Sequence, residues 1–397
     1  MLRLSFFVFF YVAMIPYFSV RAQASEYVAL IGADIYPVSA PLIRQGVLIL
    51  KKGRIQALGT HLPIPENATI YQLSGKRVYP GLILSNFVFA VSPQGQLEEN
   101  LDPYQDWVEF LLSVGVTNVH TAIHRGNQDF GPYTTTAILN LNPLQSDQWI
   151  LAQNVSIYLD SFFRSPSGLF DLRQKLQQAR KQIQANPKLQ QSNDPYIRLI
   201  LKQVPARVHL DSRDQLEQLI RLVRETSIQV VVEGAEEGWI VASDLAREGI
   251  AGVLFTRQVR QPYDPATLPV GASLRNAFLC ARAGFCFALS VPGASIIRPG
   301  GTLNQDVLTF HLEPAFAIRE GLSEDIALRS ITSDAAKIIG LEHEIGSIRP
   351  GLRANLAVFD GDIFHYASFC TMTFVDGQLI YEKSTSSLYS KIPPKSN

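Results

Sequence analysis

The segment Val78-Tyr-Pro-Gly-Leu-Ile-Leu-Ser-Asn-Phe-Val-Phe-Ala90 joins two regions with different sequence patterns. Before it, from Tyr27 to Tyr71, short β-rich runs alternate with turns, and Lys52-Gly53 predicts a tight turn between two of them. After it, short apolar strands alternate with helical patterns, which is typical of βα units around a parallel sheet. The sequence therefore predicts a small β-domain that leads into a larger α/β domain.

Length and composition agree with this division. At 397 residues the chain has room for one large barrel and a modest second domain, since a (β/α)8 barrel takes about 250 residues. Charged residues make up 18% and hydrophobic residues 47%, which excludes a disordered chain. The formal net charge is zero, so nothing in the charge indicates a nucleic-acid partner.

Residues 1–24 predict a secretory signal peptide. A basic start at Arg3 precedes an apolar run from Leu4 to Phe18, and Ala22-Gln23-Ala24 is a cleavage signal of the A-x-A type. An uncleaved anchor is the alternative, but the run has about 15 residues and a spanning helix needs roughly 20. We therefore expect a periplasmic or secreted chain with no membrane anchor after cleavage.

The three cysteines, Cys280, Cys286 and Cys370, cannot all pair within one chain. Cys280 and Cys286 could lie close together, because one falls in a predicted helix and the other in the next strand. The favoured interpretation is that they are buried small hydrophobic residues.

Further stretches carry a family resemblance. Gly32–Pro37, Gly46–Gly59, Ser74–Ile83 and Ile345–Asp360 are similar, in order and spacing, to the signatures at both ends of the amidohydrolase superfamily, in its imidazolonepropionase-like, metal-dependent hydrolase subgroup. The resemblance covers about residues 27–383. It implies an α/β fold in which a (β/α)8 TIM-like barrel is joined to a small β-sandwich domain formed by both chain ends.

The resemblance also implies the domain boundaries. They are a signal peptide over 1–24, the N-terminal part of the β-sandwich over 25–79, the barrel over 80–343, the C-terminal part of the β-sandwich over 344–383, and a polar tail over 384–397.

In that superfamily, divalent metals are held by imidazoles and carboxylates at the C-terminal ends of barrel strands. Most of the implied ligands are replaced here. Asn86 and Val88 stand at the two histidine positions of the first strand. His209 keeps the histidine of the fifth strand, but Glu233-Gly234 lacks the histidine of the sixth. The aspartate of the eighth strand is absent as well, since Val291-Pro292 follows Ser290.

A lone imidazole does not hold a divalent ion against water, because protein sites need three or four ligands. We therefore expect no cofactor, and His209 becomes either a vestigial pocket residue or a histidine hydrogen-bonded inside the barrel. The alternative is a rearranged zinc site, in which His120, His124 and Glu233 join His209. Nothing in their spacing requires these side chains to converge.

Two functions remain open. The favoured one is an exported amidohydrolase homologue with a degenerate metal site, which serves as a non-catalytic binding or partner subunit. Its partner would be an intact paralogue or a second copy, and its small-molecule ligand is not indicated. The alternative is an active hydrolase of C–N bonds, non-peptide or dipeptide-like, with the rearranged metal site. Fold resemblance alone does not decide between them.

Export gives the first testable prediction. If Ala22-Gln23-Ala24 is a cleavage signal, exported protein begins near Ser25. Intact-mass measurement of protein from the periplasm or medium should give the mass of a chain without residues 1–24. An exported chain that keeps these residues contradicts the prediction.

Overall fold

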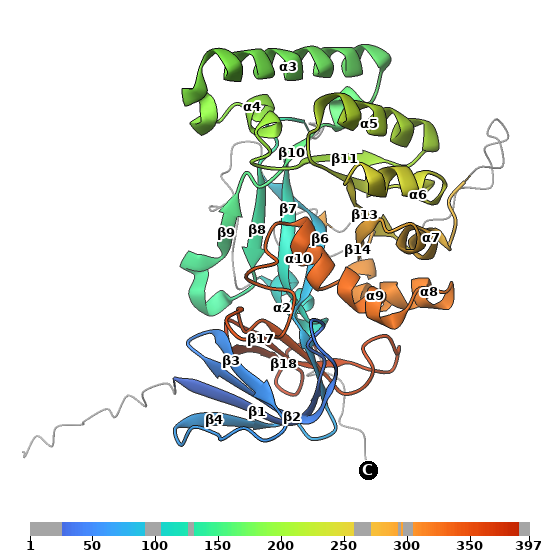
Figure 1. Cartoon of the computed structure of the whole chain (residues 1–397). Coiled ribbons are helices and arrows are strands. Elements are labelled where there is room, and N and C mark those ends of the chain that lie inside the picture. The colour runs from blue at the N-terminus through green and yellow to red at the C-terminus, as the bar shows by residue number, and fades with distance from the viewer. Residues whose placement is uncertain are drawn as a thin grey trace, which may run out of the picture.

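Figure 1 shows a computed structural model of the whole chain. The structure describes residues 26–91, 105–125, 131–257, 271–292, 295–296 and 305–388. The predicted signal peptide and most of the predicted polar tail lie outside these residues. Among the described residues, no helix has both the length and the apolarity that a membrane span requires.

Both ends of the chain build one eight-stranded sheet, whose strand order is β18-β17-β16-β5-β1-β2-β3, with β4 paired to β1. The central joint is the antiparallel pair β5–β16, in which Pro80 lies opposite Leu356. The Lys52-Gly53 turn between β2 and β3 is confirmed, and both of its residues have positive φ. The strands are β1 (Tyr27–Ile35), β2 (Ile43–Lys51), β3 (Arg54–Gly59), β4 (Ala68–Gln72), β5 (Arg77–Pro80), β16 (Leu356–Phe359), β17 (Cys370–Val375) and β18 (Gln378–Glu382).

The larger part of the chain contains two five-stranded sheets. The first has the order β15-β6-β7-β8-β9, with β6 (Leu82–Val91), β7 (Val116–Arg125), β8 (Thr136–Asn140), β9 (Ile150–Gln153) and β15 (Ser295–Ile296). The second is parallel throughout, with the order β10 (Ile157–Tyr158), β11 (Ala206–Leu210), β12 (Val230–Gly234), β13 (Ala251–Phe255) and β14 (Cys286–Ser290). The described strand pairs do not join these sheets, so the chain is a mixed α/β protein in which barrel closure stays a prediction.

Helices cover the outer face of the parallel sheet, with α5, α6, α7, α8 and α9 following one another along one side (Figure 1). The helices are α2 (Asp106–Ser113), α3 (Pro166–Ala185), α4 (Pro195–Ile200), α5 (Arg213–Thr226), α6 (Gly238–Arg247), α7 (Asn276–Arg282), α8 (Glu313–Arg319), α9 (Glu324–Ser330) and α10 (Ser333–Ile338). Short 3-10 turns are η1 (Pro143–Gln148), η2 (Asp160–Phe162), η3 (Pro187–Gln191) and η4 (Gln305–Leu312).

The sequence from Ala206 to Leu254 predicts a βαβαβ segment, whose first helix has N-cap residues at Ser212 or Asp214 and an apolar stripe, and the structure forms it from β11 to β13. Ser212 caps α5 by accepting a hydrogen bond from the Gln215 N–H, and the Gln215 side chain accepts one from the Ser212 N–H in return. The predicted apolar stripe of α5 is buried, at Leu216, Leu219, Ile220 and Val223. This stripe attaches the helix to the sheet that carries the candidate site.

Two expectations about secondary structure are wrong. The strand after β7 is not a parallel βα unit, since β8 runs antiparallel to β7 and β9 antiparallel to β8. Only about ten residues separate β7 from β8, and a parallel crossover needs a dozen or more. The sequence from Leu322 to Leu341 has the pattern of one long helix, but the structure breaks it into α9 and α10 at Thr332, whose φ and ψ are −133° and −94°. There the N–H of Ile83 on β6 donates to the carbonyl of Ile331.

A buried polar cluster fastens the eight-stranded sheet to β7 and β8. The Asn355 side chain donates to Asn118 Oδ1 at 2.8 Å and to Asn140 Oδ1 at 3.0 Å. It also accepts from the Asp376 N–H, while Asn140 Nδ2 donates to Asp376 Oδ2. Because all four residues are buried, each hydrogen bond that is lost leaves a polar group without water.

We therefore predict that Asn355→Ala destabilises the protein by roughly 3 kcal/mol, the sum of several unsatisfied buried groups. Urea unfolding followed by circular dichroism measures the change. Asn193→Ala, at an exposed asparagine, is the control and should change stability by less than about 0.5 kcal/mol. Equal effects of the two substitutions would show that the cluster does not hold the two parts together.

Candidate functional site

Polar side chains from seven strands meet between the two five-stranded sheets. Hydrogen bonds connect them in pairs across neighbouring strands and across the gap between the sheets. The group, called here the interior polar cluster, consists of Ser85 and Asn86 on β6, His120 on β7, Thr136 on β8, Ser156 and Tyr158 at β10, Arg207 on β11, Glu233 on β12 and Ser290 on β14.

The β6 side of the cluster lies in a β-bulge. Leu84 pairs with Val119 and Phe87 with Thr121, so Ser85 and Asn86 together face the single residue between Val119 and Thr121. A bulge redirects side chains, and here the Asn86 amide contacts β14, with Oδ1 accepting from the Ser290 hydroxyl. Asn86 stands at one of the implied metal-ligand positions, and its side chain is used in a contact between strands.

The centre of the cluster is an ion pair that the sequence interpretation missed. Arg207 Nη1 lies 2.5 Å from Glu233 Oε1, and the two side chains are 1% and 9% exposed. The same nitrogen donates to the Ser85 carbonyl at 2.8 Å, and the Tyr158 hydroxyl donates to Glu233 at 3.1 Å. One guanidinium thus joins β11, β12 and β6.

The alternation of side chains along β11 could have identified Arg207 as a site residue. Residues two apart on a strand face the same side, so Arg207 shares its face with His209, which was identified as an inward candidate. An arginine at such a position, inside an otherwise apolar strand, has to be paired when it is buried. Its partner Glu233 was among the predicted site residues, but as a possible metal ligand.

His209 has a different environment. Its side chain is 48% exposed and its Nε2 lies 3.1 Å from Asp211 Oδ2. This hydrogen bond raises the pKa of His209 to about 9, against an opposing effect of burial. The imidazole is therefore protonated at neutral pH, and a metal would have to displace this proton in order to bind. Its backbone N–H donates to Asp160 Oδ1, and burial raises the pKa of the Asp160 carboxyl to about 7.

His120 lies inside the cluster, where its Nε2 is 3.0 Å from the Ser156 hydroxyl. Burial, followed by the charge of Arg207, lowers the pKa of His120 well below its usual value, so the ring is neutral. His124 pairs through its backbone with Ala90, and its side chain is outside the described residues. The structure therefore brings His120 and Glu233 into one cluster, with His209 at its edge.

The donor set of the cluster does not fit a divalent metal. Among the residues that the structure describes, no three His, Cys, Asp or Glu side chains form a group that could hold one. Glu233 is bound to a guanidinium, which would repel a cation, and Val88 carries no donor atom.

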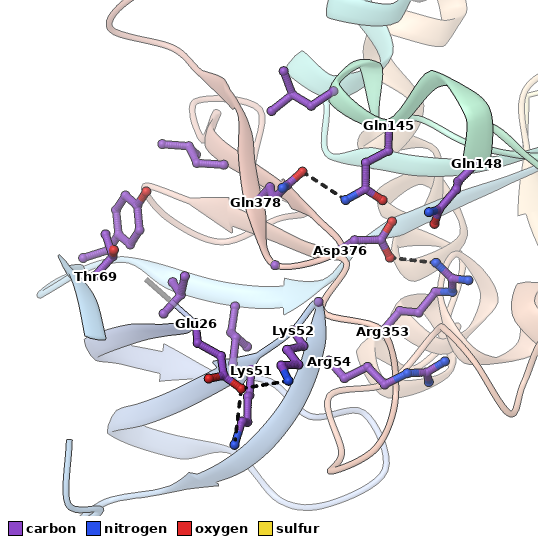
Figure 2. Close-up of a pocket in the computed structure, with 17 residues that line it drawn as sticks. Glu26, Lys51, Lys52, Arg54, Thr69, Gln145, Gln148, Arg353, Asp376 and Gln378 are labelled. Carbon is purple, nitrogen blue, oxygen red and sulfur yellow. Dashed lines mark hydrogen bonds and ion pairs between the residues drawn. The ribbon is translucent and has the colours of Figure 1, made fainter. Parts of the chain in front are cut away.

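A second cleft, of about 570 Å³, lies at the edge of the eight-stranded sheet beside η1 (Figure 2). Its lining includes four basic side chains, and each is paired with a carboxylate. Lys51 and Lys52 share Glu26, as Figure 2 shows. Arg353 binds Asp376 at 2.8 Å, and Arg54 binds Glu344 at 2.9 Å. The four basic side chains thus share three carboxylates, and Asp376 links the cleft to the polar cluster that fastens the sheet.

The buried ion pair yields a stability prediction. Arg207→Met leaves Glu233 buried without its counter-ion and should cost about 3–5 kcal/mol. Adding Glu233→Gln removes the uncompensated charge, so the double variant should recover at least half of that loss. Urea unfolding of both single variants and the double variant forms the required cycle. Additive losses would mean that the two side chains do not interact.

Residues 309–381 match the model of the amidohydrolase family. A curated 5-methylthioadenosine/S-adenosylhomocysteine deaminase of Symbiobacterium thermophilum is 34% identical over 71 residues, which is 14% of this chain and 16% of that enzyme. The chain thus matches only a small part of this relative's length, so the relative's activity does not transfer to it.

The solved structures extend the comparison to most of the chain. An amidohydrolase from Thermotoga maritima superposes with a TM-score of 0.71 at 20% identity, covering 90% of this chain and all of that one. A structure titled as a putative prolidase from Bifidobacterium longum gives 0.54 at 14% identity, with 90% and 95% coverage. At these identities the likeness establishes the fold alone. The family match and the shared fold relate this chain to the amidohydrolase superfamily, as a divergent relative that lacks most of the metal ligands.

Proposed function

We propose that this protein is an exported, non-catalytic binding subunit built on an amidohydrolase scaffold. The observation that carries the proposal is the Arg207–Glu233 pair, which uses the one acidic side chain of the predicted metal site to neutralise a guanidinium. A fixed arginine supplies positive charge in the interior, but it does not activate water as a divalent metal does. In this interpretation the protein still binds a ligand but does not hydrolyse it.

The proposal includes a closed barrel. Two contacts support it by bridging the five-stranded sheets at both of their edges. Asn86 on β6 binds Ser290 and, at 3.5 Å, the Val291 carbonyl beyond β14. At the other edge, the Thr136 hydroxyl on β8 donates to the carbonyl of Ser156, which precedes β10. The two sheets would then be the halves of a single (β/α)8-like barrel that has one antiparallel strand, β8.

A binding role is supported by buried polar atoms that have no hydrogen-bond partner among the described residues. Three of them belong to the interior polar cluster, namely Arg207 Nη2, Ser85 Oγ and His120 Nδ1. Each such atom costs about 1–3 kcal/mol of folding free energy, a cost that a polar ligand group would remove. The small-molecule ligand would thus be held by hydrogen bonds from β6, β7 and β11.

Export rests on the signal-peptide pattern of residues 1–24, and the partner is proposed to be an intact paralogue or a second copy of the chain. The alternative, an active hydrolase of C–N bonds, requires His120, His124, Glu233 and His209 to share a zinc ion. The ion pair on Glu233 and the protonated state of His209 argue against it. A thermal test separates the two functions.

A metal bound only to the folded state raises the melting temperature by mass action. We predict that a chelator leaves the melting temperature of the full-length protein unchanged and that zinc gives no saturable upward shift. His209→Ala should behave in the same way, and His343→Ala, at an exposed histidine away from the cluster, is the matched control.

A chelator-induced drop that His209→Ala abolishes and His343→Ala preserves would contradict the proposal. It would mean that His209 still holds a metal and that the alternative function is correct.

A further inference from the structure

The outer face of α7 carries two arginines that stack on one aromatic ring. Arg275, Phe278 and Arg282 are spaced at i, i+3 and i+7, which places them on one side of a helix. The guanidinium carbon of Arg275 lies 5.0 Å from the centre of the Phe278 ring, and that of Arg282 lies 5.7 Å from it. Both distances are within the range of cation–π attraction.

Neither guanidinium is neutralised by a described residue. Arg275 and Arg282 are both exposed, and among the described carboxylates none forms an ion pair with either. Stacking occupies the flat face of a guanidinium and leaves its N–H edge free, which is the edge that binds a carboxylate in the bidentate manner. The ring of Phe278 thus holds two positive donors in place before anything binds them.

A stacked arginine whose N–H edge binds a carboxylate occurs on the next helix of the same chain. Arg257 lies 5.4 Å from the centre of the Phe316 ring, and its Nε donates to the Glu313 carboxylate at 2.7 Å. A stacked arginine with a carboxylate on its edge is therefore a stable unit in this fold. Arg275 and Arg282 provide the stacked arginines, and no carboxylate of the described residues binds their edges.

The surroundings of the two arginines have the composition of a protein interface. Trp239 at the start of α6 is tied to α7, since its N–H donates to the Asn276 side chain at 2.9 Å. Large apolar side chains remain exposed on these adjoining elements, to 37% for Trp239, 50% for Leu274 and 43% for Phe316. Aromatic residues and arginine are the residue types enriched in interfaces and their hot spots. Helices α6, α7 and α8 follow one another along the same side of the molecule (Figure 1).

From this arrangement we infer that α6, α7 and α8 form a docking surface for a protein segment that carries at least two carboxylates beside apolar side chains. The two arginines stacked on Phe278 bind the carboxylates, and the exposed side chains Trp239, Leu274 and Phe316 bind the apolar part. Charge complementarity selects an acidic peptide segment as the occupant. The inference rests on the proposed function, since it names the surface through which a binding subunit meets its partner.

The test uses the full-length protein and fluorescein-labelled, terminally blocked hexapeptides in anisotropy titrations. The acidic probe is Asp-Glu-Phe-Leu-Glu-Asp, and its neutral isostere is Asn-Gln-Phe-Leu-Gln-Asn. We expect saturable binding of the acidic probe that weakens with added salt, and at least tenfold weaker binding of the isostere.

Variants locate the binding. Arg275→Glu with Arg282→Glu should weaken binding of the acidic probe at least tenfold. Arg275→Lys with Arg282→Lys keeps the positive charge but loses the bidentate N–H edge of the guanidinium, so we expect severalfold weaker binding of the acidic probe. The control reverses the charge of two exposed lysines on other elements, Lys181→Glu with Lys188→Glu. It should change the affinity for the acidic probe less than twofold. Thermal melts confirm that each variant is folded.

Several results would overturn the inference. These are the absence of binding, equal binding of both peptides, and equal losses in the arginine variants and the lysine control.

Stronger binding to phosphatidylserine vesicles than to the peptide would assign the surface to a membrane. Self-association that the arginine reversal abolishes, measured by sedimentation velocity, would assign it to a second copy. If the protein binds neither metal nor peptide, only this inference is wrong. If it binds zinc, the proposed function is wrong and the peptide result is unaffected.

Discussion

A guanidinium buried between two sheets constrains everything around it. Arg207 cannot lose its charge, and an unpaired charge in a protein interior costs several kcal/mol. The chain meets this constraint with Glu233 on the neighbouring strand, the Ser85 carbonyl on the other sheet and the Tyr158 hydroxyl, which donates to Glu233. The same constraint makes the site unsuitable for a metal, because a cation at Glu233 would face the guanidinium directly.

The ion pair belongs to a set of side-chain contacts that connect the strands of the two sheets. In a metal-dependent barrel, ligands from several strands are tied to one ion, and that ion stabilises the fold. In this chain side chains connect the strands through the Arg207–Glu233 pair, the Asn86–Ser290 contact and the bond between His120 and Ser156. Buried polar networks of this kind hold a unique arrangement when most of their members are satisfied. The unsatisfied atoms that remain are where a ligand is expected.

Much of the fold could be predicted from the sequence, because it depends on local patterns. The Lys52-Gly53 turn, the Ser212 cap of α5 and the alternation of strands and helices after β11 are read from residue types and periodicity. The pairing of β5 with β16 joins residues far apart in the chain, and only the resemblance at both ends indicated it. The antiparallel course of β8 and the break at Thr332 were missed, since both depend on connections and contacts that periodicity does not encode.

The site was predicted in part. Loss of the metal ligands is visible in single residues such as Val88, and Glu233 was identified as part of the site. Arg207 was missed because ligand positions, taken from the resemblance, directed attention to histidines and carboxylates. The convergence of Arg207, Ser85 and Tyr158 depends on how the two sheets face each other, which no local pattern specifies. Long-range geometry therefore decides which side chains meet in the interior.

We propose that the Arg207–Glu233 ion pair occupies the interior of the two sheets in place of a metal. Crystals of the full-length protein grown with excess zinc, with diffraction data collected above and below the zinc absorption edge, test it directly. We predict a direct contact between the Arg207 guanidinium and the Glu233 carboxylate, and no anomalous peak within bonding distance of His209, His120 or Glu233. An anomalous peak bound to these side chains, with Arg207 turned away from Glu233, would contradict it.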